Sequence, residues 1–200
     1  MADLILILMS FVNKFGYFGV FFSTTLEYAC FPVSSEILLP FIGCCVYNGT
    51  MSLSKCIGVS LLGAVLGCSA CFFAGRFGRR VIDKLSSKSL GIKNGIKKSE
   101  NKFNKYGSFS VFIFRLFPIS RTYISFPAGM SSMSYTTFIV YSVLGALVWN
   151  TVLISIGYML GEHWEDFTIF FEDHKSLVNL IFILICLMIV FKILKNRKSA

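Results

Sequence analysis

The sequence predicts an all-α polytopic membrane protein, and its composition and apolar stretches are the reasons. Hydrophobic residues make up 55% of the 200 positions and charged residues 14%, and the mean hydropathy is +0.72. A soluble domain carries about 25% charged residues, so this chain lacks the polar surface of a soluble enzyme. In a chain this apolar, the net charge of +9 indicates the cytoplasmic face of a membrane and not a nucleic-acid partner.

Three apolar stretches are long enough to span a bilayer, which takes about 20 helical residues. They are residues 53–75, 135–160 and 177–194, and the last is an additional C-terminal transmembrane helix. Residues 1–14 are apolar but too short to span, so they predict an interfacial helix.

Two further apolar regions, residues 15–47 and 107–130, carry charges and prolines near their centres. A broken backbone is tolerated at membrane depth only where protein or a wet cavity surrounds it. We therefore interpret each region as a re-entrant hairpin. The predicted breaks are Pro32, Pro40 and Gly43 in the first hairpin, and Pro118, Pro127 and Gly129 in the second.

The distribution of charge orients these segments. Residues 76–106 form a basic amphipathic segment, residues 161–176 an acidic loop, and residues 195–200 a basic tail. By the positive-inside rule, the two basic segments are cytoplasmic and the acidic loop lies outside. The two hairpins then enter the membrane from opposite sides, and each is followed by one spanning helix.

An internal repeat supports this inverted arrangement. Residues 13–21 align with residues 104–112 with six of nine identities. Further along, residues 31–34 align with 117–120, Gly43 aligns with Gly129, and residues 60–64 align with 142–146. Inverted repeats with broken helices and a binding site between them are typical of secondary transporters.

Four charged side chains lie inside the predicted hairpins, and two interpretations of them remain open. A charge at the bilayer centre costs about 2.5–3.5 kcal/mol, so these groups must face one another, water or a ligand. They could be Glu–Arg pairs that only hold the hairpins together. Alternatively, Arg115 and Arg121 bind phosphate, because a guanidinium group can donate two parallel hydrogen bonds to phosphate oxygens. Burial disfavours a charged carboxylate, so Glu27 and Glu36 would then exchange protons.

The second hairpin also resembles a known family. The stretch Arg115-Leu116-Phe117-Pro118-Ile119-Ser120-Arg121-Thr122, followed by Pro127-Ala128-Gly129-Met130, is similar to the signature of the DedA family, also called the SNARE-associated or VTT-domain family. The resemblance covers about residues 13–160 and includes Glu27, residues 32–36, Gly63, Gly67, residues 75–78 and Trp149. Ser34 and Cys68 depart from the family pattern, in which many members have a proline and an acidic or polar residue there.

The resemblance implies a lipid transporter of the cytoplasmic membrane. Undecaprenyl phosphate is the main expected substrate, with transport coupled to protons or another cation. Family members require acids matching Glu27 and Glu36 and arginines matching Arg115 and Arg121. The alternatives are a phospholipid flippase or scramblase, for example for phosphatidylethanolamine, and a non-transporting assembly or membrane-integrity factor. The oligomeric state is left open, with a homo-oligomer among the alternatives.

No pattern in the chain predicts an enzyme, a metal site or a cofactor. His163 and His174 lie in the acidic loop without metal-ligand spacing, and no histidine lies in the hairpins to act as a phosphatase nucleophile. No Walker motif follows the glycines near residue 76. The seven cysteines lie in apolar stretches and are interpreted as small hydrophobic residues: Cys30, Cys44, Cys45, Cys56, Cys68, Cys71 and Cys186.

Overall fold

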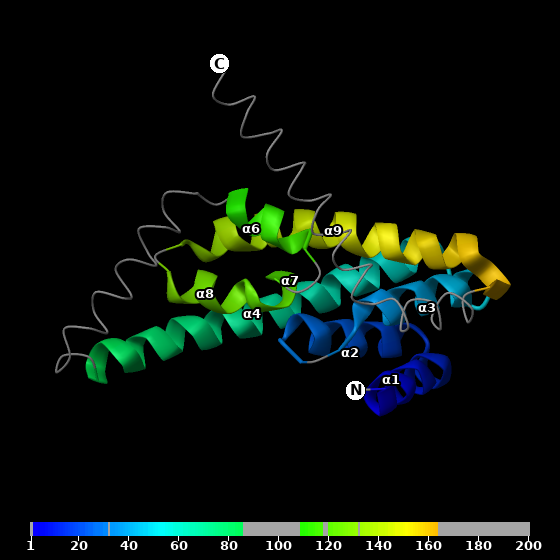
Figure 1. Cartoon of the computed structure of the whole chain (residues 1–200), viewed down its shortest axis with the longest axis horizontal. Helices are drawn as coiled ribbons and strands as arrows, with labels where there is room; N and C mark the ends of the chain where they lie inside the picture. The colour runs from blue at the N-terminus through cyan, green and yellow to red at the C-terminus, as the bar shows by residue number, and fades with distance from the viewer. Residues whose placement is uncertain (1, 32, 86–108, 118–119, 132, 164–200) are drawn as a thin grey trace, which may run out of the picture.

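The computed structural model describes residues 2–31, 33–85, 109–117, 120–131 and 133–163, and all regular structure within these ranges is helical. Two long helices lie along the long axis of the molecule, and shorter helices pack against them (Figure 1). The elements are α1 (Ala2–Phe15), α2 (Tyr17–Tyr28), α3 (Ser35–Tyr47), α4 (Leu53–Leu85), α6 (Phe109–Arg115), α7 (Ser120–Tyr123), α8 (Ser125–Met130), α9 (Tyr135–Leu160) and the 3₁₀ turn η2 (Gly161–His163).

The two long helices correspond to two of the predicted spans. Residues Leu53–Arg79 of α4 and Tyr135–Leu160 of α9 are long and apolar enough to cross a membrane. The helix α4 does not end near residue 75 as expected but continues to Leu85. Gly75 is not a helix cap; it lies where a Cβ atom would overlap the Phe126 carbonyl of α8. The third predicted span, 177–194, lies outside the described residues.

Each predicted hairpin region contains short helices that run in opposite directions. In Figure 1, α2 runs toward the left and α3 returns to the right, whereas α6 runs toward the right and α7 and α8 return to the left. The helices are separated by residues 29–34 in the first region and by residues 116–119 in the second. This order is compatible with two oppositely directed hairpins, and their re-entry into a membrane stays a prediction.

The positions of the breaks differ from the prediction. Pro40 and Gly43 lie inside α3, and Pro127 and Gly129 lie inside α8. Pro127 occupies the first turn of α8, where a helix needs no backbone N–H and therefore tolerates proline. The other two predicted break residues, Pro32 and Pro118, lie outside the described residues.

Each long helix packs against one arm of each hairpin region, where an arm is the helical segment before or after the break. The helices α2 and α8 pack on α4, while α3 and α6 pack on α9. The first arm of each region thus contacts the long helix that follows it, and the last arm contacts the other long helix. An inverted repeat predicts this exchange of contacts.

Glycines allow the closest of these helix crossings. A Cβ atom at Gly43 would overlap the Ile154 carbonyl of α9, and one at Gly129 would overlap the Phe72 carbonyl of α4. These two glycines are aligned in the internal repeat, and each lies on the last arm of its hairpin region. Small residues let apolar helices approach closely where lipid supplies no hydrophobic driving force.

The helix expected at the N-terminus is present as α1. It packs on α2 and α3, with Leu8 and Val12 buried and Leu6 and Ile7 exposed. Its location at a membrane interface stays a prediction.

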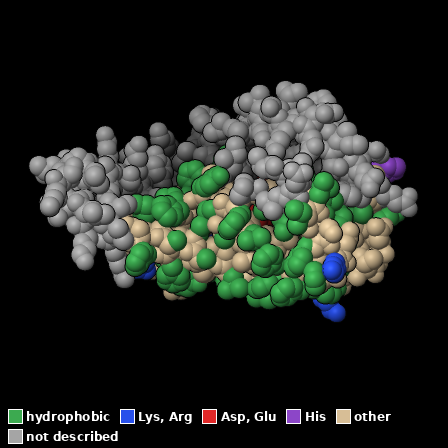
Figure 2. Space-filling view, turned by 90° about the horizontal axis from the view of Figure 1, so that it is seen from below, with side chains coloured by type: hydrophobic (Ala, Val, Ile, Leu, Met, Phe, Trp, Pro, Cys, Tyr) green, Lys and Arg blue, Asp and Glu red, His purple; other side chains and the backbone are tan. Residues whose placement is uncertain are grey.

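Large apolar side chains cover much of the described surface. Met159 is 84% exposed and Phe77 67%, which in water would favour aggregation. Figure 2 shows hydrophobic side chains across the middle of one face, with Lys and Arg groups toward its two ends. This pattern suits a surface that meets acyl chains in the middle and headgroups at the ends.

Candidate functional site

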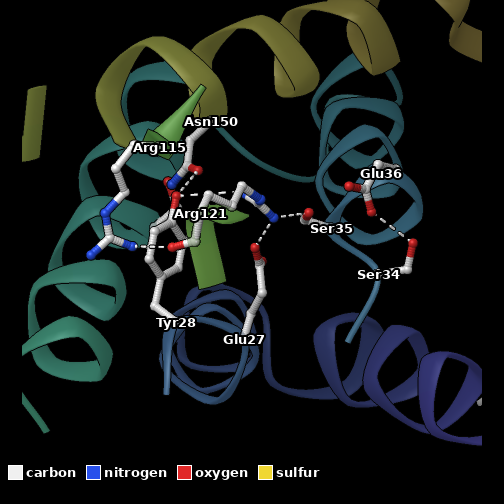
Figure 3. Close-up of polar contacts among 9 residues, drawn as sticks. Glu27, Tyr28, Ser34, Ser35, Glu36, Arg115, Arg121 and Asn150 are labelled. Atoms are coloured by element: carbon white, nitrogen blue, oxygen red, sulfur yellow. Dashed lines mark hydrogen bonds and ion pairs between the residues drawn. The ribbon is translucent and has the colours of Figure 1, made fainter. Parts of the chain in front are cut away.

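A buried ion pair joins the two hairpin regions. Arg121 of α7 is 3% exposed and Glu27, in the last turn of α2, is 1% exposed. The Arg121 Nη2 atom donates hydrogen bonds to Glu27 Oε1 and to the Ser35 hydroxyl at the start of α3 (Figure 3). Arg121 therefore contacts both arms of the first hairpin region from within the second.

Arg115 ends α6 and is just as deeply buried, at 1% exposure. Its Nη1 atom donates to the Arg121 carbonyl at 2.7 Å, and its Nη2 atom donates to the hydroxyls of Ser125 at 2.8 Å and Ser142 at 3.2 Å. Among the described residues, no carboxylate forms an ion pair with Arg115. Within the described ranges, neutral oxygens and the rings of Tyr28 and Phe138 therefore surround this charge.

Tyr28 contacts both arginines. Its ring centroid lies 5.4 Å from Cζ of Arg115 and 5.5 Å from Cζ of Arg121, distances at which a ring face attracts a cation. Its hydroxyl accepts a hydrogen bond from Arg121 and donates one of 2.8 Å to Asn150 of α9. Tyr28 thereby fixes the position of both guanidinium groups.

The hydrogen-bond chain continues from Tyr28 into the long helices. Asn150 Nδ2 donates to the Ser60 hydroxyl of α4 at 3.1 Å, and Ser60 donates to the Ile57 carbonyl at 2.9 Å. The indole ring of Trp149 lies 4.7 Å from Cζ of Arg121. Polar contacts therefore link α2, α4, α7 and α9 at one place inside an apolar molecule.

Glu36 does not join this network. It is half-buried on α3, and its Oε2 atom accepts a hydrogen bond of 2.8 Å from the Ser34 hydroxyl. Figure 3 draws a hydrogen bond between this carboxylate and Ser34 and none between it and Arg121. Of the four predicted site residues, the structure brings Glu27, Arg115 and Arg121 together, whereas Glu36 forms no ion pair with either arginine among the described residues.

The cluster carries more positive than negative charge. Its two guanidinium groups face one carboxylate, and Glu27 Oε2, Arg115 Nε and Arg121 Nε have no hydrogen-bond partner in the part of the chain that the structure describes. An uncompensated buried charge is costly, and guanidinium N–H groups bind phosphate or carboxylate oxygens strongly. The arrangement can therefore hold an anion beside Arg115.

Several residues of the cluster escaped the sequence reasoning. Tyr28 and Asn150 carried no recognised motif, although a lone amide inside the apolar stretch 135–160 is a signal of a buried hydrogen bond. Ser142 also has a signal, because it aligns with Ser60 in the repeat and both hydroxyls accept from the cluster. Ser125 had none.

Metal-ligating side chains do not gather elsewhere within the described ranges. No group of three or more His, Cys, Asp or Glu residues there has the proximity to hold a metal ion. His163 is exposed in η2, and His174 lies outside the described residues.

Comparisons with known proteins agree with the earlier resemblance. The family model of the VTT domain matches residues 31–159. An "alkaline phosphatase-like protein" of Lactococcus lactis (strain IL1403) is 33% identical over 197 residues, which cover 96% of this chain and 92% of the relative. "Undecaprenyl phosphate transporter A" of Bacillus subtilis (strain 168) is 32% identical over 167 residues, 83% of this chain and 82% of the relative.

"Protein DedA" of Escherichia coli (strain K12) is 27% identical over 151 residues, which cover 75% of this chain and 67% of the relative. No solved structure matches the chain significantly. The family model covers well over half of the chain and includes Ser35, Arg115, Arg121 and Asn150 of the buried cluster, whereas Glu27 and Tyr28 precede the matched residues. The chain is a membrane protein that belongs to the VTT-domain family, also called the DedA family.

Proposed function

We propose that the protein translocates a lipid with a phosphate headgroup across the cytoplasmic membrane, with undecaprenyl phosphate as the first candidate. The buried Arg115, which has no carboxylate partner among the described residues, carries this proposal. The Bacillus relative named undecaprenyl phosphate transporter A supports the choice of lipid.

The two arginines have different parts in the proposed mechanism. Arg115 attracts the phosphate, because within the described residues its charge has no carboxylate partner and its Nε–H has no hydrogen-bond acceptor. Arg121 is held by Glu27 until a proton neutralises that carboxylate, and it then turns to the phosphate as well. Loss of the proton restores the Glu27–Arg121 pair and expels the phosphate, which couples transport to protons.

Glu36 has a second, separate part in this proposal. It forms no ion pair with either arginine among the described residues and is half-buried on α3, where it would exchange protons between the cluster and the headgroup region. The apolar tail of the lipid stays in the bilayer beside the exposed apolar faces of the helices.

The lipid leaves chemically unchanged in this proposal, which makes the protein a transporter and not an enzyme. No cofactor takes part. An assay that separates the phosphate lipid from its dephosphorylated alcohol tests this directly, because a phosphatase would release the alcohol and inorganic phosphate.

A structural role is the second candidate, and the Glu27–Arg121–Ser35 contact favours it. This contact bridges both arms of one hairpin region to the other region, as a staple in an assembly factor would. The double variant Glu27→Arg with Arg121→Glu separates the two roles. A staple survives the exchange, whereas a transporter loses its phosphate-binding arginine next to Arg115 and stops transport.

The main test is transport in proteoliposomes that contain the purified full-length protein. Labelled undecaprenyl phosphate and phosphatidylethanolamine are offered with and without a proton gradient. We expect transport of the phosphate lipid that the gradient accelerates and that Arg115→Gln abolishes. The exposed Arg76 on α4 supplies the matched control Arg76→Gln, which keeps activity. Equal transport in the absence of a gradient indicates a scramblase, and full activity of Arg115→Gln contradicts the proposal.

A further inference from the structure

Two cysteines from separate elements face each other beside the buried cluster. The Sγ atoms of Cys30, which follows α2, and Cys71, on α4, are 2.9 Å apart. Both are free thiols in the structure. Cys30 is half-buried and thus open to small reagents, whereas Cys71 is 9% exposed.

The backbone at Cys30 would suit glycine better than cysteine. Its φ of +66° is the one left-handed value at a non-glycine residue in the described ranges. Cys30 N–H donates to the Glu27 carbonyl at 3.3 Å and Phe31 N–H to the Leu26 carbonyl at 3.2 Å, which is the Schellman pattern that ends many helices. A residue with a side chain is less stable than glycine in this conformation, because its Cβ atom crowds the following carbonyl oxygen. A cysteine at this position therefore costs stability that its thiol contacts must offset.

The Cys30 thiol also contacts the second hairpin region. Its S–H group is directed toward the Thr122 carbonyl, with the sulfur 3.0 Å from the oxygen, and Thr122 follows Arg121 directly. A single thiol thus lies at the junction of the segment after α2, the helix α4 and the helix α7.

We propose that Cys30 and Cys71 form a reversible disulfide that fastens the end of α2 to α4. The sulfurs already face each other and need to approach by less than about 1 Å to reach the bonding distance of about 2.05 Å. The inference is independent of the lipid and of the direction of transport.

The oxidant in this reaction is a low-molecular-weight disulfide. One protein thiolate attacks it, which breaks the reagent's S–S bond, forms a mixed disulfide and releases one thiol. The second cysteine then attacks the mixed disulfide, forms the Cys30–Cys71 bond and releases the second thiol. The protons of the two cysteine thiols end on the two released thiols. The two cysteines are thereby oxidised to a disulfide, and the reagent is reduced by two electrons.

Bond formation exchanges one contact for another. The disulfide has no S–H group, so Cys30 no longer donates to the Thr122 carbonyl. The first hairpin region is then covalently tied to α4 and loses a hydrogen bond to the second region, next to Arg121. Any change in lipid movement that follows rests on the proposed function, whereas the disulfide itself does not.

A third cysteine supplies an internal control. Cys68 lies one helical turn before Cys71 on α4 and is 1% exposed. It is close along the helix but makes no described hydrogen bond to Cys30. The geometry therefore selects Cys71 and not Cys68 as the partner.

The test uses full-length protein in detergent or nanodiscs and the small reagent 2,2′-dithiodipyridine at about one equivalent. After alkylation of the remaining thiols and digestion without reductant, mass spectrometry identifies linked peptides. We expect the linked Cys30–Cys71 peptide to be the dominant intramolecular product and to disappear on reduction. It should still form in Cys68→Ser and be absent in Cys71→Ser and Cys30→Gly. Cys30→Gly also relieves the backbone, so its folding is preserved.

A dominant Cys30–Cys68 peptide, or stable mixed disulfides at Cys30 and Cys71 without a link between them, would overturn the inference. Both outcomes are read on monodisperse wild-type protein, so neither depends on the folding of a variant. Failure of lipid transport in the proteoliposome assay leaves the disulfide result unaffected, which keeps the two proposals distinguishable.

Discussion

At the scale of single residues, Arg115 and Arg121 differ in what balances their charge. Arg121 contacts the Glu27 carboxylate, whereas Arg115 contacts a backbone carbonyl and two serine hydroxyls. A buried charge that forms no ion pair within the described residues remains attractive to an anion. In the proposed mechanism, this difference gives phosphate capture to Arg115 and the control of capture by protons to Arg121.

Replacement of Arg115 by lysine tests the geometry of capture. A single ammonium group cannot reach the Arg121 carbonyl, Ser125 and Ser142 together and also fork onto phosphate. We expect Arg115→Lys to transport at least about tenfold more slowly, equivalent to about 1.4 kcal/mol, in the proteoliposome assay. The exposed Arg76→Lys should transport normally. Wild-type rates for Arg115→Lys would remove forked binding from the mechanism.

Two substitutions of Tyr28 distinguish what its ring and its hydroxyl each contribute to stability. Tyr28→Phe keeps the ring against both guanidinium groups but deprives Asn150 of its donor, which should cost about 1–3 kcal/mol. Tyr28→Leu also removes the ring and should be less stable still. Thermal unfolding of the purified variants in detergent measures both losses, and equal stabilities of the two variants would contradict a role for the ring.

Glu27 should give transport its dependence on pH. Acidification adds a proton to the carboxylate, weakens the pair with Arg121 and frees that arginine for phosphate. Wild-type transport should therefore accelerate as the pH falls, and Glu27→Gln should give a flat profile because its amide carries no titrating proton. A Glu27→Gln profile that matches the wild type would assign the proton dependence to another group.

At the scale of elements, glycines determine how closely the arms approach the long helices. A Cβ atom at Gly67 of α4 would overlap the Thr25 carbonyl of α2, whereas one at Gly58 of the same helix would meet nothing within 4 Å. A Cβ atom at Gly67 would also overlap the Cβ atom of Tyr28. The close packing of α2 on α4 therefore positions Tyr28 in the buried cluster.

These two glycines form a matched pair of test positions. Gly67→Ala should lower the stability by about 1–3 kcal/mol through overpacking. Gly58→Ala should leave it unchanged or raise it by up to about 1 kcal/mol, since alanine favours a helix. Thermal unfolding in detergent compares the two. Similar melting temperatures would show that α2 and α4 do not depend on this close approach.

The sequence predicted elements better than it predicted contacts. The spans at 53–75 and 135–160 follow from apolar length, and the repeat aligned Gly43 with Gly129 before either was known to lie at a crossing. The breaks predicted at Pro40 and Pro127 are wrong, because both prolines lie inside helices. Pro127 is tolerated in the first turn of α8, and the structure offers no such reason for Pro40 in the interior of α3.

The site was predicted in part for a similar reason. Charges inside apolar stretches must find partners, which brought Glu27, Arg115 and Arg121 to attention. The same rule drew attention to Glu36, which accepts from Ser34 and forms no ion pair with an arginine among the described residues, so its part in proton exchange stays a prediction. The serines that solvate Arg115 resemble other serines in the sequence, so only the three-dimensional structure distinguishes them.

At the scale of the whole molecule, the exchange of arms between the two long helices suits alternating access. Each half of the molecule consists of one hairpin region and the long helix that follows it. Each long helix contacts one arm from each half, and Arg121 of the second half forms an ion pair with Glu27 of the first. Breaking this pair removes one polar link between the halves, while the Tyr28–Asn150 hydrogen bond and the glycine crossings remain. Rocking of one half against the other around a fixed anion site is then the simplest motion of the proposed transporter.

The most direct test of the phosphate site is a comparison of binding with and without the phosphate. Purified protein in nanodiscs is titrated with undecaprenyl phosphate and with undecaprenol, which differ only in that group. The wild type should bind the phosphate at least about tenfold more tightly, a difference of about 1.4 kcal/mol, and Arg115→Gln should bind both alike. Equal affinities in the wild type, or an undiminished preference in Arg115→Gln, would contradict the account.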